Sequence, residues 1–156
     1  MADRTAYLDA LHLLAGRELS VKQLRARLLE RDHPADEIHR AVEHLLETGS
    51  LDDRRVAGAY VATAVKVKGR GRLRIQQELQ EMGIDRDVAG EALAEAFGDL
   101  DERTLVQNAL QKKLRGTTKI KTPADYARVY QFLMRQGFSP AVVNAALRQY
   151  RRGDDV

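Results

Sequence analysis

The 156-residue sequence contains no cysteine and no tryptophan, and phenylalanine and tyrosine together number only eight. The lack of cysteine excludes disulfide frameworks, thiolate metal sites and cysteine nucleophiles. No run of 18 uncharged apolar residues occurs, and the first residues include acids where a signal peptide needs basic side chains. We therefore expect a soluble protein of the cytoplasm that has no membrane partner.

The apolar residues that are present, mainly leucine, valine and alanine, favour packed helices. They recur with helical spacing, as in Tyr126, Val129, Tyr130, Leu133 and Met134, and no convincing alternation indicates a strand. The pattern predicts helices over residues 4–16, 20–31, 35–48, 52–67, 72–82, 86–97, 101–115, 123–136 and 140–151.

Capping residues separate these predicted helices. Ser20 with Gln23, and Thr122 with Asp125, have the spacing of capping boxes. All three prolines fit the first turn of a helix, where the missing amide hydrogen has no partner to lose. Five glycines follow apolar stripes, where a left-handed residue closes a helix: Gly49, Gly83, Gly98, Gly116 and Gly137.

The last two thirds of the chain are related by an offset of 54 residues. Seven apolar or turn positions match: Ile75, Leu79, Gly83, Ile84, Val88, Ala92 and Leu93 align with Val129, Leu133, Gly137, Phe138, Val142, Ala146 and Leu147. A weaker copy lies 51 residues earlier, with His33 in place of Ile84. We predict an all-α fold of three tandem three-helix repeats, over 1–51, 52–98 and 99–156. The repeats should form an elongated, curved array whose neighbours bury each other's apolar faces.

Positive charge is concentrated towards the C-terminus and in two blocks. Lys and Arg number 7 against 9 acids in residues 1–51, 8 against 8 in 52–98, and 11 against 6 in 99–156. The stretch KVKGRGRLRI (66–75) contains five cations and two glycines but no acid. Residues 103–124 contain six cations and no acid. Such blocks either are solvated loops or bind a polyanion or an acidic surface.

The clustering favours an interaction surface, and aromatic residues for base stacking are nearly absent from it. We therefore expect non-specific electrostatic contacts rather than reading of base sequence. The candidate contact residues are Lys66, Lys68, Arg70, Arg72, Arg74, Lys112, Lys113, Arg115, Lys119, Lys121, Arg148, Arg151 and Arg152.

No pattern points to catalysis, a cofactor or a metal. Asp52 and Asp53 begin a predicted helix, where capping explains them better than acid–base chemistry does. His39 and His44 are five residues apart, so they do not converge on a metal as an i, i+4 pair would. The glycine turn matches neither nucleotide-binding signature, because Arg74 stands where GxGxxG needs glycine and no GK[ST] ending occurs.

Three segments of the chain together closely resemble the RecX family, whose members restrain the RecA recombinase. They are GSLDDRRVAGAYV, KGRGRLRIQQELQEMGI and FLMRQGFSPAVVNAAL. Ser50 replaces an aromatic of the family pattern, and Arg70 and Arg72 make the turn more cationic than usual. The resemblance implies docking along the RecA–DNA filament, direct DNA binding, and inhibition of RecA ATPase, strand exchange and coprotease activities, with no reaction of its own. We also expect the chain to be a monomer. Two alternatives stay open: a DNA- or RNA-binding protein with no filament partner, and a scaffold for an unrelated protein.

Overall fold

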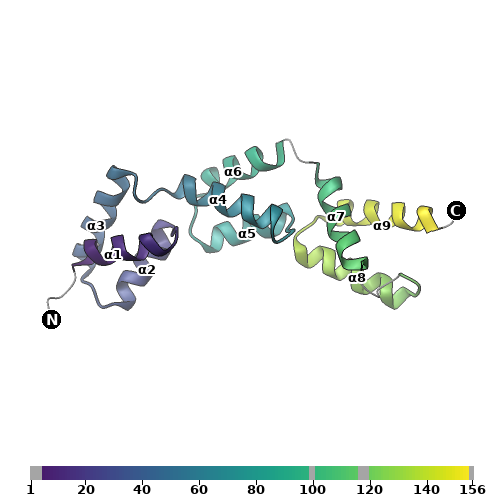
Figure 1. The fold of residues 1–156 in the computed structure, drawn as a ribbon, viewed down its shortest axis with the longest axis horizontal. Coiled ribbons are helices and arrows are strands. Elements are labelled where there is room, and N and C mark those ends of the chain that lie inside the picture. Colours follow the sequence, from purple (N-terminus) through teal and green to yellow (C-terminus); the bar gives the residue numbers. More distant parts are fainter. Residues whose placement is uncertain (1–4, 99–100, 116–119, 155–156) are drawn as a thin grey trace.

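The structure is a computed structural model that describes residues 5–98, 101–115 and 120–154, with side chains described as far as Tyr150. These residues form no strand and nine α-helices: α1 (Ala6–Gly16), α2 (Val21–Glu30), α3 (Ala35–Thr48), α4 (Asp53–Lys66), α5 (Arg72–Glu81), α6 (Arg86–Gly98), α7 (Glu102–Leu114), α8 (Pro123–Gln136) and α9 (Pro140–Asp154). Figure 1 shows an elongated molecule with α1–α3 at one end and α7–α9 at the other. The predicted all-α, elongated architecture is confirmed.

Helix boundaries follow the capping residues closely. Each helix begins and ends within two residues of its predicted range, except that α9 continues to Asp154. Ser20 and Thr122 both form complete capping boxes, with Gln23 and Asp125 respectively. These reciprocal hydrogen bonds satisfy amide groups that have no partner inside the helix, which is why both positions could be identified from the sequence.

Some prolines and glycines at the helix ends differ from the prediction. Pro34 is the N-cap of α3 rather than part of its first turn, because its ψ of 145° is still extended. Gly49, Gly83 and Gly137 adopt the left-handed conformation as predicted, with φ of 79°, 79° and 100°. By contrast, Gly98 is the last residue of α6 and has no positive φ. Gly116 lies outside the described residues.

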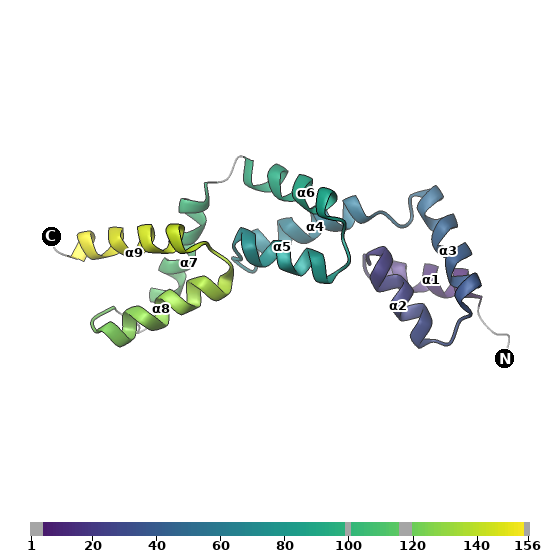
Figure 2. The same ribbon diagram turned by 180° about the vertical axis from the view of Figure 1, so that it is seen from behind.

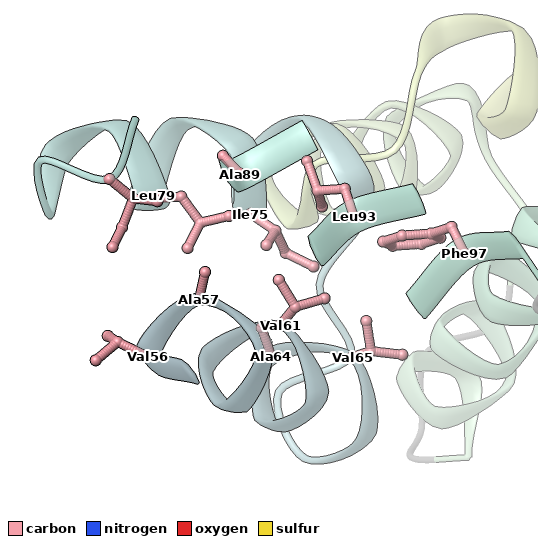
Figure 3. Packing of buried hydrophobic residues seen from close by; sticks show 11 residues of the cluster. Val56, Ala57, Val61, Ala64, Val65, Ile75, Leu79, Ala89, Leu93 and Phe97 are labelled. Atoms are coloured by element: carbon pink, nitrogen blue, oxygen red, sulfur yellow. The ribbon is translucent and has the colours of Figure 1, made fainter. Parts of the chain in front are cut away.

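The helices pack into three separate units, α1–α3, α4–α6 and α7–α9, called here the first, second and third units. Figure 2 shows the same three groups from behind. Each unit encloses its own buried apolar cluster. Figure 3 shows the second of these, in which side chains from α4, α5 and α6 meet: Val56, Ala57, Val61, Ala64, Val65, Ile75, Leu79, Ala89, Leu93 and Phe97.

The sequence repeat is also a repeat of buried positions. Ile75 and Leu79 in the second unit are fully buried, as are Val129 and Leu133 in the third. Leu24 and Leu28 take these places in the first unit. His33, which replaces the next apolar residue, instead contacts the buried carboxylate of Asp9, with 2.8 Å between Nε2 and Oδ2. A hydrogen bond thus takes the place of an apolar contact in the first unit.

The junctions between units are mostly polar, which corrects the expectation that neighbours bury each other's apolar faces. At the first junction, the Ser20 hydroxyl donates to the Met82 carbonyl oxygen at 2.6 Å, and the Val21 amide donates to Asp53 at 2.9 Å. Among the described residues, Leu105 of α7 is the only apolar side chain that packs against the clusters of two units, the second and the third. Each unit buries an apolar cluster of its own, so little apolar surface remains for its neighbour.

Candidate nucleic-acid interface

The basic stretch 66–75 spans the turn between α4 and α5. The amides of Lys68 and Arg70 donate to the carbonyl oxygens of Thr63 and Ala64, closing the end of α4. Gly69 between them has φ of 62°, a conformation that side-chain-bearing residues rarely adopt. A Cβ on Gly69 would meet no atom within 4 Å, so the tip of this turn is open.

Two of the five cations in this stretch are directed inwards. Arg70 contacts the carboxylate of Glu78, and Arg74 Nε lies 3.0 Å from the other oxygen of the same carboxylate. The side chains of Arg70 and Glu78 are only 19% and 16% exposed. Burial, and to a smaller extent the charge of neighbouring Glu81, raise the pKa of Glu78. Arg70 and Arg74 therefore have an internal counter-ion.

The remaining cations of the stretch, Lys66, Lys68 and Arg72, are exposed. Within the described part of the chain, none of the three forms an ion pair. Lys68 Nζ lies 5.5 Å from the centre of the Tyr60 ring, a distance at which the ring attracts a cation. Glu78 offsets one of the five positive charges of this turn, and the three exposed side chains present most of the charge that remains to solvent.

The same stretch also forms the second junction. The Gly71 amide donates to the Gln136 carbonyl oxygen at 2.6 Å, and the Leu73 amide donates to that of Gly137 at 3.1 Å. Arg74 reaches the carbonyl oxygen of Arg135 at 3.1 Å. A Cβ on Gly71 would lie 2.6 Å from the Gly137 backbone, so only glycine permits this approach. The basic turn therefore fixes the third unit against the second.

The second basic block lies at the end of α7 and the start of α8. Lys112, Lys113, Arg115 and Lys121 are all exposed. Lys113 Nζ lies 4.7 Å from the centre of the Phe132 ring of α8. Lys119 lies outside the described residues. This block therefore presents four cations to solvent, and one of them, Lys113, lies over α8.

Part of each basic block lines a single cavity of about 310 Å³, called here the junction cavity. Its lining comes from the 66–75 stretch, α7 and α8 and includes no acidic side chain: Lys68, Gly69, Ala109, Lys112, Lys113, Phe132 and Gln136. Lys68 is 44 residues from Lys112 in the sequence. Docking of the third unit onto the second thus brings together cations that the sequence keeps apart.

The cations of α9 are not part of the junction cavity. Arg148 is exposed and, with Arg103, lines another cavity of about 300 Å³ between α7 and α9. Arg151 and Arg152 belong to α9, but their side chains lie outside the described residues. The proposed contact residues therefore occupy at least two separate places on the molecule.

The paired acids at the start of α4 have structural partners. Asp52 accepts hydrogen bonds from the amides of Arg54 and Arg55, so its predicted capping role is confirmed. Asp53 instead accepts from the Val21 amide at the N-terminus of α2, across the first junction. Burial raises the pKa of Asp53, and this hydrogen bond opposes the rise. Among the described residues, no group of three or more potential ligands is placed to hold a metal ion.

Three family models match the chain in sequence order: the first, second and third three-helix domains of RecX, over residues 6–45, 52–93 and 101–147. The chain belongs to the RecX family. "Regulatory protein RecX" of Trichlorobacter lovleyi is 32% identical over 85% of this chain and 86% of its own length. The protein of the same name from Halorhodospira halophila is 34% identical over 88% and 83%.

Solved RecX structures share the fold. The crystal structure of RecX from Lactobacillus salivarius superposes with a TM-score of 0.77, at 21% identity, over 92% of this chain and 93% of that one. Another crystal structure of regulatory protein RecX gives a TM-score of 0.78 at 23% identity, over 92% and 70%. No described helix of this RecX chain has the length and apolarity needed to cross a membrane.

Sequence reasoning missed the role of Glu78. The signal was present, since Arg74 and Glu78 are four residues apart on one helix, a spacing that places opposite charges side by side. The contact of Arg70 with the same carboxylate depends on how the turn folds back and has no local signature. The carbonyl groups of Arg135, Gln136 and Gly137 carry no side-chain signal at all, so this half of the RecX junction could not be identified from the sequence.

Proposed function

We propose that the chain regulates the RecA recombinase by binding lengthwise along the RecA–DNA filament, without a chemical reaction of its own. Membership of the RecX family is the observation that carries this proposal. The elongated arrangement of three units supports it, because a long ligand can contact several subunits of a filament at once. A partner that assembles on DNA also places the action of the chain in the cytoplasm.

The exposed cations supply the surface for a negatively charged assembly. Lys66, Lys68 and Arg72 extend from the second unit, and Lys112, Lys113, Arg115 and Lys121 extend from the third. We infer that these side chains contact the filament and its DNA, mainly by non-specific electrostatic attraction. Lys119, Arg148, Arg151 and Arg152 stay in the proposed contact set. Arg70 and Arg74 act in it chiefly by holding the turn and the junction in place.

Binding alone is enough to modulate the filament. A ligand that prefers one filament geometry stabilises that geometry by the difference between its affinities for the two states. A monomer that bridges neighbouring subunits would therefore slow ATP hydrolysis, strand exchange and coprotease action if these need the filament to change shape. Backbone hydrogen bonds join the second and third units, so we expect such a bridge to be stiff.

The proposal is tested by comparing binding to RecA filaments assembled on single-stranded DNA with binding to the same DNA alone. A co-sedimentation assay at several salt concentrations should show tighter binding to the assembled filament at every concentration. Equal affinity for filament and naked DNA would instead favour a plain nucleic-acid-binding protein. Binding to neither would exclude both functions.

A further inference from the structure

We propose that the junction cavity binds one nucleotide of single-stranded nucleic acid, with its phosphate at the lysines and its base against the apolar side of the cavity. This inference deepens the proposed function, on which it rests for the choice of DNA as ligand. It assigns one specific DNA contact, among the electrostatic ones, to a defined place on the molecule. It also predicts a preference for single strands, which neither the charge blocks nor the fold predicts.

The charge of the cavity selects an anion. Lys68, Lys112 and Lys113 line it without an acidic side chain, and the described residues offer none of the three an ion-pair partner. By contrast, the larger cavity between the first and second units, which Lys68 also lines, includes Glu18, Glu78 and Glu81. Three ammonium groups of one sign around a concave site focus positive potential there, which attracts phosphate.

The apolar side of the cavity selects more than a bare phosphate. Phe132 and Ala109 line it. Phe132 is partly exposed, and Lys113 Nζ lies over its ring, so a base that contacts the ring must displace this ammonium group or approach the ring beside it. The cavity between α7 and α9 has two arginines but no aromatic side chain in its lining. Aromatic rings stack with unpaired bases irrespective of base identity, and this contact contributes about 1–3 kcal/mol per base. The combination of lysines and phenylalanine thus fits a nucleotide better than an inorganic anion.

The size of the cavity favours a single strand. Its volume of about 310 Å³ lies at the lower end of the range of about 300–1,000 Å³ that is usual for small-ligand sites. A base can enter such a site only if it is unpaired and turned out of the stack, which a single strand allows more readily than a duplex does. In a duplex the same lysines could still reach phosphates, but the base would contribute nothing.

The cavity exists only while the second and third units are docked. Lys68 and Gly69 belong to the second unit, whereas Lys112, Lys113 and Phe132 belong to the third. Gln136 lines the cavity and also accepts the junction hydrogen bond from Gly71. A substitution that separates the units should therefore weaken strand binding without changing any charge.

The test measures fluorescence anisotropy of labelled oligothymidine with the full chain, without RecA. The charge variant is Lys112→Gln with Lys113→Gln, and its matched control is Arg25→Gln with Arg27→Gln, two exposed cations of α2. We expect the charge variant to bind about tenfold more weakly, with the slope of log affinity against log salt reduced by about 1.4. The control should bind like the wild type. Phe132→Leu should lose several-fold affinity, and Phe132→Tyr should regain it.

A second comparison tests the base contact. An abasic oligonucleotide of the same length should bind several-fold more weakly than oligothymidine, and polyglutamate of the same charge should compete poorly. Equal loss in the charge variant and its control, equal binding of the abasic strand, or equal competition by polyglutamate would each overturn the nucleotide site. The last result would indicate an acidic protein segment as the ligand.

Failure of this inference is distinguishable from failure of the proposed function. A wild-type chain that suppresses RecA ATP hydrolysis but does not bind oligothymidine contradicts the nucleotide site and leaves the regulatory function standing. A chain that binds oligothymidine through the junction cavity but has no effect on RecA supports the nucleotide site and contradicts the regulatory function.

Discussion

The amide nitrogen of Gly71 lies 2.6 Å from the carbonyl oxygen of Gln136, and this hydrogen bond joins the second unit to the third. The first junction uses the equivalent positions of the repeat. Ser20, the N-cap of α2, contacts the carbonyl of Met82, and Gly71, the N-cap of α5, contacts that of Gln136. In both cases a turn of one unit docks on the start of a helix in the unit before it, so the array repeats its junctions as well as its cores.

Gly71→Ala should separate the second and third units without unfolding either. The φ of Gly71 is −85°, which suits alanine, but its Cβ would lie 2.6 Å from the Gly137 backbone. Small-angle X-ray scattering should show a changed maximum dimension while circular dichroism retains the helix content. In the control Gly90→Ala, the Cβ meets no atom within 4 Å, so this variant should keep the wild-type shape. An unchanged scattering curve for Gly71→Ala would contradict the observed junction.

Arg70 and Arg72 are two residues apart but should behave differently. Arg70→Gln removes an ion pair from half-buried Glu78 and should lower the free energy of unfolding by about 1–3 kcal/mol. Arg72→Gln should change it by less than about 0.5 kcal/mol, because Arg72 is exposed, yet should weaken binding to the RecA filament. Urea unfolding and filament co-sedimentation of both variants check this. Equal destabilisation by the two substitutions would count against the inward direction of Arg70.

Asp9 should make the first unit sensitive to acid. Burial alone would raise the pKa of Asp9, but the hydrogen bond from His33 and the charge of Arg31 outweigh it and lower that pKa. A carboxyl group with a lowered pKa in the folded state stabilises the fold above its unfolded pKa of about 3.9, and the stabilisation is lost as pH falls through the folded pKa. Lowering the pH should therefore destabilise the first unit, because the stabilising contribution of Asp9 is lost.

The variant Asp9→Asn measures this contribution. It should unfold at lower urea concentration than the wild type at pH 7, by about 1–3 kcal/mol, and the difference should shrink as pH falls below about 4. Asp36→Asn, which changes an exposed acid of α3, should show a far smaller difference throughout. A wild-type advantage that stays constant down to pH 2 would mean that the charge of Asp9 is not what stabilises the fold.

The sequence predicted the helices and the three-unit architecture because local physics determines them. Capping at Ser20 and Thr122, and apolar spacing such as that of Val129 and Leu133, depend on residues within a few positions of each other. The same holds for the left-handed glycine at position 137, which closes α8. Such features can be recognised from residue types and from the spacing of apolar residues, so the predicted helix ends lie within a few residues of the observed ones.

The candidate site was less accessible from sequence because it depends on contacts between units. The sequence identified the cations of both basic blocks but not which of them pair internally. The inward direction of Arg70 depends on Glu78. Lys68 and Lys113 line the same cavity only because backbone groups form the second junction. Similarly, the contact of His33 with Asp9 joins α1 to the turn after α2 and follows no local period.

The central claim, that this chain restrains RecA through the assembled filament, is tested most directly by RecA ATP hydrolysis on single-stranded DNA. Purified chain is added in increasing amounts to preassembled filaments, with the variant Lys112→Gln with Lys113→Gln measured alongside. The rate of hydrolysis should fall with increasing chain, and the variant should need a higher concentration for the same effect. A hydrolysis rate that stays unchanged at a saturating concentration of the wild-type chain would contradict the account.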